Sequence, residues 1–375
     1  MTNDEDSRRL TRRTVVGGGL AAAFAMQLPA QTRNAKLGLI GLGNRAQRHL
    51  AAYREMGDVE IPALSDIQAE RMRAAQSGPA ANAELYVDYR ELIADKNVEA
   101  VVIAVPNFLH AKIAIEAMEA GKDVLMEKPI GLTYEEAKHV AAVAKKLGRI
   151  VAVGMQRHYA ADYRKIIEIV RGGDLGAVHL YTLNEYRGDW NPKTWALADP
   201  ITGKLVPWRH LRSLAGSSLL EFSVHSYGFL YEMIAAPITK CSATGGAMHW
   251  PERTTEDVIA VIAEFGDVRL QHTYCGFAPG AEWQLTIAGD KGSLQYDRRR
   301  AVLRVAGSDP QELDLSSPVD AQSNEAQVYR DFFRAVRDRS QPELNPDFAI
   351  EASKLAYAAW MSIDENRFIT DKDFG

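Results

Sequence analysis

Cysteine is scarce in this 375-residue chain, which contains only Cys241 and Cys275. This scarcity excludes a disulfide-dense scaffold, because such scaffolds need several cysteines in a short chain. No group of cysteines and histidines has the spacing of metal ligands, so we expect no metal site. Two cysteines on separate strands are typical of core residues, although an oxidising compartment would allow them to pair.

An excess of positive charge is also lacking. Lysine and arginine number 44 against 49 aspartates and glutamates, which gives a formal net charge of −5. Nucleic acids and anionic membranes attract basic proteins, so we expect neither as a partner. The front of the chain has no long apolar run either, because the stretch from Gly17 to Met26 is weakly apolar and too short to span a bilayer stably.

That stretch lies in an N-terminal segment with the pattern of an export signal. Ser7-Arg8-Arg9 and Thr11-Arg12-Arg13 precede the apolar stretch, and small residues close the segment near Ala30. A charged start, a short apolar centre and a small-residue exit describe a signal peptide, and the arginine pair beside Thr11 indicates the twin-arginine route. We expect residues 1–30 to engage the twin-arginine export machinery, with an uncleaved membrane anchor as the alternative.

The rest of the chain is long enough for two domains. From residue 36 to 155 apolar strands alternate with helical stretches, which predicts βαβ units and a doubly wound parallel sheet in an α/β fold. The expected strands are Lys36–Ile40, Val59–Leu64, Ala100–Val105, Asp123–Met126 and Ile150–Val153. The expected helices are Gln47–Glu55, Ala69–Gln76, Tyr89–Ala94, His110–Ala120 and Thr133–Leu147.

Residues 156–375 have a different texture, with longer strands separated by turns such as Gly289-Asp290-Lys291-Gly292. This pattern predicts an α+β domain with a large open, mainly antiparallel sheet. The expected strands are Val178–Tyr186, Ile238–Gly245, Asp257–Glu264, Val268–Tyr274, Glu282–Ala288 and Ser293–Asp297. The expected helices are Tyr159–Arg171, Ala326–Arg339 and Ile350–Asp364.

A glycine turn connects the first strand to the first helix. Gly41 would make the tight turn, Gly43 would leave space for phosphates, and Asn44 and Arg45 open a helix whose N-terminus attracts an anion. Asp66 follows the second strand, where an acidic side chain holds the ribose hydroxyls of NAD and repels the 2′-phosphate of NADP. We therefore expect NAD rather than NADP; the alternative is that Asp66 only caps the next helix.

Polar residues follow two more strands of the expected parallel sheet. Pro106 keeps the backbone extended, so Asn107 and His110 would face the nicotinamide half of the cofactor, unless they form only a helix cap with a surface histidine. After the next strand, Glu127 would contact the nicotinamide ribose and Lys128 a substrate hydroxyl. Burial and the positive nicotinamide ring would lower the pKa of this lysine, which suits proton transfer.

These motifs resemble those of the Gfo/Idh/MocA oxidoreductases, which include glucose–fructose oxidoreductase and inositol dehydrogenase. The resemblance rests on the glycine turn that ends in His49, on Pro-Asn-x-x-His at 106–110, on Ala-Gly-Lys-Asp-Val-Leu-Met-Glu-Lys-Pro at 120–129, and on Gly-Met-Gln-Arg at 154–157. It implies a Rossmann domain, an open-sheet C-terminal domain, and hydride transfer between NAD(P) and a sugar or polyol. The lysine of the family's Glu-Lys-Pro motif corresponds to Lys128.

The family's other catalytic motif is an aspartate and a histidine four residues apart after a glycine-rich turn. Glu221 and His225 have this spacing here, with glutamate in the place of aspartate. On a helix the two would share a face, so the carboxylate would orient the imidazole and His225 would act as general base, or else His225 is a buried structural histidine. The longer arm of Glu221 puts its role in doubt, and the acidic residue that often follows His225 by three positions is Gly228.

An aromatic-rich segment between the strand ending at Tyr186 and Glu221 supplies further substrate candidates. Flat rings beside arginines suit a sugar, with a packed loop or a subunit contact as the alternative. The candidates are Trp190, Trp195, Trp208, Arg209 and His210, with Arg157 and Tyr159 as weaker ones.

The favoured hypothesis is an exported, periplasmic or secreted oxidoreductase that acts on a sugar, polyol or sugar acid. Free NAD is scarce outside the inner membrane, so the cofactor would be loaded in the cytoplasm and held tightly. An NAD-dependent glycosidase that oxidises its sugar transiently is the alternative, although Phe222-Ser223-Val224-His225 differs from the Tyr-Pro-Thr-His of that branch. A nucleotide-binding sensor without catalysis is a third. Open sheets bury their exposed face, so we expect a homo-oligomer, a dimer or a tetramer.

Overall fold

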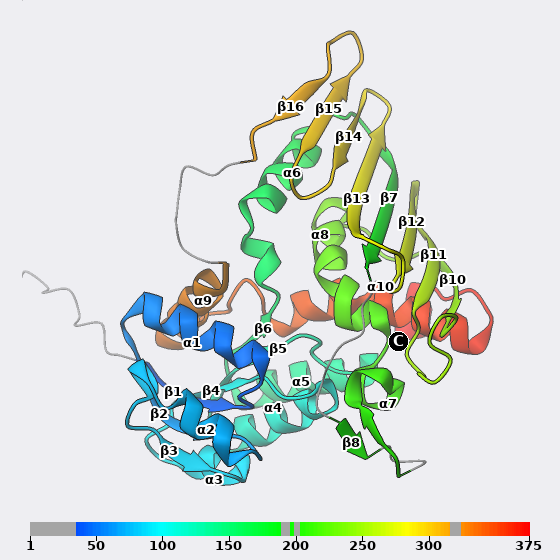
Figure 1. Ribbon diagram of the computed structural model, residues 1–375. Coiled ribbons are helices and arrows are strands. Elements are labelled where there is room, and N and C mark those ends of the chain that lie inside the picture. The colour runs from blue at the N-terminus through cyan, green and yellow to red at the C-terminus, as the bar shows by residue number, and fades with distance from the viewer. Residues whose placement is uncertain (1–34, 189–195, 199–202, 316–323) are drawn as a thin grey trace, which may run out of the picture. The chain divides into compact units, whose positions relative to one another are not determined.

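The computed structural model describes residues 35–188, 196–198, 203–315 and 324–375. Residues Asn34–Gly375 form one compact unit, which contains a six-stranded parallel sheet and an eight-stranded mixed sheet (Figure 1). Trp190, Trp195 and the expected export signal at residues 1–30 lie outside the described residues. Within the described part of the chain, no helix combines the length and the apolar character that a membrane crossing requires.

The parallel sheet has the strand order β3-β2-β1-β4-β5-β6. Its strands are β1 (Ala35–Ile40), β2 (Val59–Ser65), β3 (Glu84–Tyr86), β4 (Ala100–Ile103), β5 (Asp123–Glu127) and β6 (Val151–Gly154). All residues of β4, β5 and β6 are buried, as expected for strands covered on both faces. The order reverses between β1 and β4, and ligands bind at such a switch point in open parallel sheets.

Helices of ordinary length connect these strands. They are α1 (Asn44–Met56), α2 (Ala69–Ala75), α3 (Tyr89–Ala94), α4 (His110–Glu119) and α5 (Tyr134–Leu147), with short 3₁₀ turns η1 (Gly78–Ala80) and η2 (Asn107–Leu109). Local chemistry sets their ends: the Thr133 side chain accepts a hydrogen bond from the Glu136 N–H, and Gly57 ends α1 with a φ of 72°. The expected Rossmann-type sheet is confirmed.

The mixed sheet has the order β10-β11-β12-β7-β13-β14-β15-β16, and only β12 and β7 pair in parallel. Its strands are β7 (Val178–Arg187), β10 (Lys240–Gly246), β11 (Val258–Phe265), β12 (Val268–Cys275), β13 (Ala281–Gly289), β14 (Gly292–Tyr296), β15 (Ala301–Val305) and β16 (Gln311–Leu313). The mainly antiparallel sheet expected from the sequence is thus confirmed, with β15 and β16 in addition. Cys241 and Cys275 are buried, unpaired cysteines.

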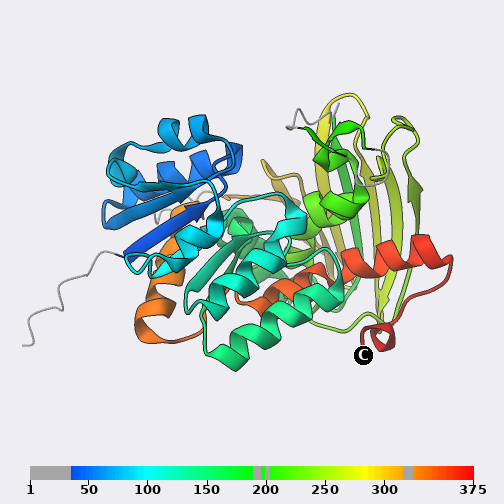
Figure 2. The ribbon, with the colours of Figure 1, turned by 90° about the horizontal axis from the view of Figure 1, so that it is seen from below.

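Helices cover one face of this sheet: α6 (Ala161–Gly172), α8 (Val224–Ile234) and α10 (Pro346–Glu365). Figure 2 shows α8 and α10 on the same side of the strands. Along β11, Ile259, Val261 and Ala263 are buried on that side, whereas Ala260 and Ile262 alternate with them and are exposed. The second face of the sheet is therefore open at β11, where Ile262 is an exposed apolar side chain.

The C-terminal part of the chain returns to the parallel sheet. Helix α9 (Asn324–Asp338) contacts α1 and β6, and α10 contacts α5, α8 and β10 (Figure 1). Arg339 forms an ion pair of 2.6 Å with Asp123 at the start of β5. Helices α9 and α10 therefore pack beside the parallel sheet, although they come late in the chain.

Short elements fill the segment between β7 and α8. They are β8 (Ala196–Ala198), β9 (Leu205–Pro207), the 3₁₀ turn η4 (Trp208–His210), α7 (Arg212–Ala215) and a π-helical turn at Leu219–Ser223. The turn η3 (Gln156–Tyr159) connects β6 to α6, and η6 (Asp371–Phe374) ends the chain.

Candidate active site

A cavity of about 790 Å³ lies at the carboxyl ends of the parallel strands. Its volume falls in the range of ligand pockets, roughly 300–1,000 Å³. Both the strand–helix turns of the parallel sheet and the segment leading into α8 contribute to its wall. The sequence-predicted residues on this wall are Gly41, Gly43, Asn44, Arg45, Asp66, Pro106, Asn107, His110, Glu127, Lys128, Trp208, Arg209, Glu221 and His225.

The glycine turn has the backbone that its sequence predicts. Gly41 has a φ of 87°, and a Cβ there would lie 2.6 Å from the carbonyl oxygen of Ala104, so only glycine fits. Gly43 is the N-cap of α1, and no side chain caps this helix. The first N–H groups of α1 are thus left for an anion at the cavity wall.

Asp66 is buried and held by backbone donors. One carboxylate oxygen accepts the Leu42 N–H at 2.7 Å, the other accepts the Gln68 N–H at 2.8 Å, and the Arg71 guanidinium lies 3.8 Å away. Gln68 is the N-cap of α2, so the capping interpretation describes part of what Asp66 does. Asp66 also borders the cavity, which the ribose interpretation requires.

Glu127 is a fixed anion beneath the first turn of α1. Its carboxylate lies 2.6 Å from Arg45 Nε and 3.2 Å from His49 Nε2. Burial opposes its ionisation, but the charges and hydrogen bonds of Arg45 and His49 outweigh burial and hold the pKa of Glu127 far below its ordinary value. Gly154 permits this arrangement, because a Cβ there would lie 2.8 Å from a Glu127 oxygen.

Lys128 reaches from β5 to the segment before α8. Its amine donates a short hydrogen bond to the backbone carbonyl of Glu221 and lies 3.5 Å from the Glu221 carboxylate. Burial, aided by the charges of Arg209 and Arg45, lowers the pKa of Lys128, although Glu221 and Glu127 act in the opposite direction. The pKa of Lys128 is therefore already lowered by the protein's own residues, without the nicotinamide ring.

Glu221 has partners other than the one expected from the sequence. Its carboxylate accepts hydrogen bonds from Arg209 Nε and Asn107 Nδ2, both at 2.8 Å. Burial opposes ionisation, but Lys128, Arg209 and the Asn107 hydrogen bond lower the pKa of Glu221 to about 2. The expected contact with His225 is replaced, because two cations and an amide occupy the carboxylate oxygens and the chain winds as a π turn at this point.

His225 borders the cavity with an unpaired ring nitrogen. Nδ1 is buried and has no hydrogen-bond partner among the described residues. Burial and the charges of Lys128, Arg45 and Arg298 lower the pKa of His225 to about 3, although Glu127 raises it. The imidazole is therefore neutral near pH 7.

His110 is arranged differently from the expectation. Its Nδ1 lies 2.8 Å from the carbonyl oxygen of Pro129 and its Nε2 lies 2.9 Å from that of Val105. Both ring nitrogens thus bond to backbone carbonyls that follow β4 and β5, while His110 also borders the cavity. Asn107 likewise points to Ala215 O and Glu221 instead of standing free.

The substrate candidates divide into two groups. Trp208 and Arg209 border the cavity, and the Arg209 guanidinium stacks 4.3 Å from the centre of the Trp208 ring. Arg157 and Tyr159 are not among the cavity-lining residues: Arg157 pairs with Asp162 at 3.2 Å and Tyr159 donates to Asp331 at 3.0 Å. Their carboxylate partners turn both side chains away from the cavity.

The cavity also contains residues that the sequence analysis did not name as site residues. Gln156 lies next to the strand end of β6, and its position in the Gly-Met-Gln-Arg motif was the available signal. The cavity wall near Asp66 is also lined by Ile67, Arg71, Val87 and Tyr89. Only the folded chain brings these residues together, so the sequence did not indicate them. Within the described chain, no cluster of three His, Cys, Asp or Glu side chains is placed to hold a metal ion.

Two family models match this chain, one in each of its two sheets. A family model described as the oxidoreductase family with an NAD-binding Rossmann fold matches residues 35–155, and the GFO/IDH/MocA C-terminal domain model matches residues 163–295. The chain belongs to the GFO/IDH/MocA oxidoreductase family. The resemblance in the strand-end motifs is thereby confirmed.

Individual relatives and solved structures match this chain with different coverage. The uncharacterized oxidoreductase YrbE of Bacillus subtilis (strain 168) is 25% identical over 88% of this chain and 95% of that protein. Inositol 2-dehydrogenase of Salmonella typhimurium is 36% identical over 143 residues, which are 38% of this chain and 43% of that enzyme. A levoglucosan dehydrogenase solved with NADH and levoglucosan has the same fold, with a TM-score of 0.76 at 20% identity over 90% of this chain and 99% of that one.

Proposed function

We propose that this oxidoreductase oxidises a hydroxyl-bearing carbon of a sugar, polyol or sugar acid and passes the hydride to NAD. The observation that carries this proposal is the shared cavity wall, where Lys128 and His225 border the same space as the glycine turn. Two relatives support the substrate class, since one is named for inositol and the other was solved with levoglucosan.

The residues at the glycine turn fit a dinucleotide. A Cβ on Gly43 would meet only Arg71 Nη1, at 3.9 Å, so the space beside this residue is open for a close approach. The uncapped first turn of α1 supplies N–H donors at the same place. Gly41, Gly43, Asn44 and Arg45 would therefore hold the diphosphate.

The protein's own residues supply the acid–base chemistry. NAD, when bound, accepts the hydride. Lys128 would donate a hydrogen bond to the oxygen of the reacting hydroxyl, and the neutral His225 would take its proton as the carbonyl forms. Glu221 keeps the Lys128 amine in place through its backbone carbonyl and balances the charge of Arg209.

Asp66 supports NAD over NADP. Its carboxylate is fixed by two backbone N–H groups, so it would repel a 2′-phosphate and accept bonds from ribose hydroxyls. In an Asp66→Ser variant we expect the ratio of the NAD and NADP dissociation constants to change in favour of NADP by about tenfold or more. Titration of both reduced cofactors, followed by fluorescence, measures that ratio; an unchanged preference contradicts the assignment.

The direct test of the proposed function uses the purified protein. Denaturation should release NAD(H), and a panel of sugars, polyols and sugar acids should contain compounds that change the nicotinamide absorbance at a rate abolished in His225→Asn. Because a tightly held cofactor must be recycled in place, a second carbonyl compound should return the absorbance to its starting value. A protein that releases no nucleotide and gains no absorbance with added NAD contradicts the proposal.

Export completes the proposal. Residues 1–30 combine arginine pairs, a short apolar centre and small residues, so the twin-arginine machinery would carry the folded, cofactor-loaded protein to the periplasm or beyond. Replacing Arg12 and Arg13 by lysine should retain the protein in the cytoplasm, as cell fractionation would show. Unchanged fractionation of the double variant contradicts this part.

A further inference from the structure

The turn that carries Gln156 into the cavity wall is short and internally bonded. The Met155 N–H donates to Val153 O at 2.7 Å, and the His158 N–H donates to Met155 O at 3.0 Å. Gln156 lies between these two bonds, and it borders the cavity. A displacement of His158 therefore passes directly to Gln156, because no flexible linker separates them.

Helix α8 lies close to this turn on the face that also carries His225. His225, Gly228 and Glu232 are spaced by three and four residues, so they share one helix face. A Cβ on Gly228 would lie 2.9 Å from the Met155 methyl group, which shows how close the two segments are. One turn further along, the Glu232 carboxylate lies 2.8 Å from His158 Nδ1.

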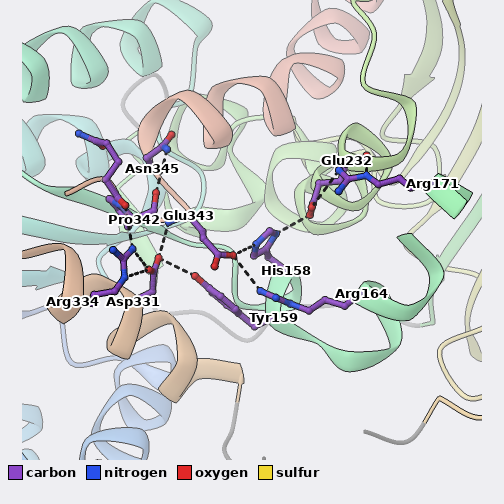
Figure 3. Close-up of polar contacts among 11 residues, drawn as sticks. His158, Tyr159, Arg164, Arg171, Glu232, Asp331, Arg334, Pro342, Glu343 and Asn345 are labelled. Carbon is purple, nitrogen blue, oxygen red and sulfur yellow. Dashed lines mark hydrogen bonds and ion pairs between the residues drawn. The ribbon is translucent and has the colours of Figure 1, made fainter. Parts of the chain in front are cut away.

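A third segment, between α9 and α10, reaches the same histidine from the other side. The Glu343 carboxylate lies 2.9 Å from His158 Nε2 (Figure 3). Asp331 of α9 orders this segment, because it accepts the Glu343 N–H at 2.7 Å and the Tyr159 hydroxyl at 3.0 Å. We call His158, Glu232 and Glu343 the His158 clamp.

The His158 clamp requires a charged imidazole. Both ring nitrogens face carboxylates, which only accept hydrogen bonds, so both nitrogens must carry protons. Burial opposes that charge, but the hydrogen bonds and charges of Glu232 and Glu343 raise the pKa of His158 to about 9. The contribution of the charged ring is complete below the ordinary histidine pKa and is lost as the pH rises through about 9.

Other charged groups around the clamp balance its carboxylates. Arg164 of α6 lies 3.2 Å from Glu343, and Arg171 of α6 lies 3.9 Å from the Glu232 carboxylate and donates to the Glu232 carbonyl at 2.8 Å. Arg334 of α9 pairs with Asp331 at 2.5 Å. On α10, the apolar Phe348 ring meets the imidazole edge to face at 5.2 Å.

We propose that His158 is a positioning residue that holds α8, and with it His225, at a fixed distance from Gln156 across the cavity. The inference rests on the proposed function and deepens it, since His158 touches neither cofactor nor substrate and acts through two residues of the cavity wall. Its loss changes the geometry of the reacting end while the glycine turn at the other end of the cavity stays intact.

The test compares His158→Gln, which can bond only one carboxylate without a charge, with His139→Gln as a control on the exposed face of α5. We expect His158→Gln to lower kcat about tenfold, because small misplacements of reacting groups are costly. NADH affinity should stay within about twofold of the starting protein. His139→Gln should change neither quantity.

A second variant makes the test independent of folding defects. Glu343→Gln removes one charge at a half-exposed position and should lower the pH at which activity falls on the alkaline side by up to about one unit, without loss of thermal stability. A parallel loss of stability, NADH affinity and kcat in His158→Gln, or an alkaline limb that Glu343→Gln leaves unmoved, overturns the proposal.

A measurement without turnover separates this inference from the proposed function. If the protein oxidises no carbohydrate, the proposed function fails, yet amide hydrogen exchange of residues 224–234 still tests the clamp. Faster exchange there in His158→Gln than in His139→Gln, with α1 unchanged, supports the positioning role. Equal exchange in the two variants overturns it.

Discussion

Lys128 and His225 are buried groups whose charged forms are disfavoured by desolvation. Their neighbours are already paired: Glu127 binds Arg45, and Glu221 binds Arg209 and Asn107. The lysine amine and the imidazole are the two groups to which the proposed function assigns proton transfer.

Lys128→Ala should lower kcat by about 10²–10⁴-fold, the usual contribution of a positioned proton donor or acceptor. NADH affinity should remain within a few fold, because the diphosphate contacts lie at the glycine turn. Single-turnover absorbance measurements separate the hydride step from cofactor binding. Lys128→Arg is the matched control: it keeps the charge but not the low pKa, and it should also be slow. A variant with full kcat would exclude the assigned role.

The direction in which the pKa of His225 is shifted determines the expected pH dependence of activity. A base is active when deprotonated, and the pKa of His225 is lowered to about 3. The profile of kcat/KM should therefore show no acid limb from this residue between about pH 8 and pH 5. Initial rates across this range check the expectation. An acid limb with an apparent pKa near the ordinary histidine value would show that the ring is less buried than the structure has it.

The roles of single residues were only partly predictable from the sequence. Strand-end motifs placed Asp66, Glu127 and Lys128 at the cavity because parallel strands end at one edge. The direction of a side chain depends on partners far along the chain, and the sequence does not show them. Tyr159 turns to Asp331 and Glu221 to Asn107 and Arg209, which is why their expected contacts were not found.

The strand–turn–helix unit of β1 and α1 is the element that organises the cofactor end of the cavity. Its two glycines have different structural reasons. Gly41 has a positive φ and no room for a Cβ, whereas the space beside Gly43 is open apart from Arg71. The fold thus requires glycine at position 41, whereas the open space at Gly43 leaves room for a ligand.

Gly43→Ala should therefore fold with a thermal midpoint close to that of the unmodified protein, whereas Gly41→Ala should be destabilised by about 1–3 kcal/mol. NADH at a hundred times its dissociation constant should stabilise the unmodified protein by about 2.7 kcal/mol. Gly43→Ala should lose most of that gain, because its methyl group occupies the phosphate space. Thermal unfolding with and without NADH measures both effects, and a full NADH response in Gly43→Ala would contradict the site.

Elements with strong patterns were predictable, and weakly patterned elements were not. The buried strands β4 and β5 have continuous apolar centres, and helix α5 after β5 has clear caps in Thr133 and Gly148. Strand β3 has only three residues, and β15 has five residues that directly follow Arg298–Arg300, so both give short patterns. The π turn at Leu219–Ser223 has no sequence signature, because tertiary contacts of its residues decide it.

At the scale of the molecule, the mixed sheet has one face packed by helices and one open face, on which Ile262 has 58% of its surface exposed. Association of two copies through this open face stays a prediction from the sequence. The homo-oligomer expected from the sequence would use this surface.

Ile262→Asp should then reduce the oligomeric state, because a charge in place of an apolar side chain is costly to bury between two copies. Light scattering coupled to size-exclusion chromatography gives the mass of each variant. Met248→Asp, at an equally exposed methionine in the turn after β10, is the matched control and should keep the mass of the unmodified protein. Equal masses for Ile262→Asp and the unmodified protein would place the contact elsewhere.

The return of the last helices to the first sheet has a consequence for biosynthesis. Arg45 of α1 pairs with Glu325, and Asp123 of β5 pairs with Arg339. Elements that the ribosome synthesises early therefore find their ion-pair partners only when later residues have been synthesised. A ribosome that has released only the first half of the chain presents a βαβ unit with these charges unmatched and one flank uncovered. The ion pairs that join the first sheet to the last helices therefore form only after Glu325 and Arg339 have been synthesised.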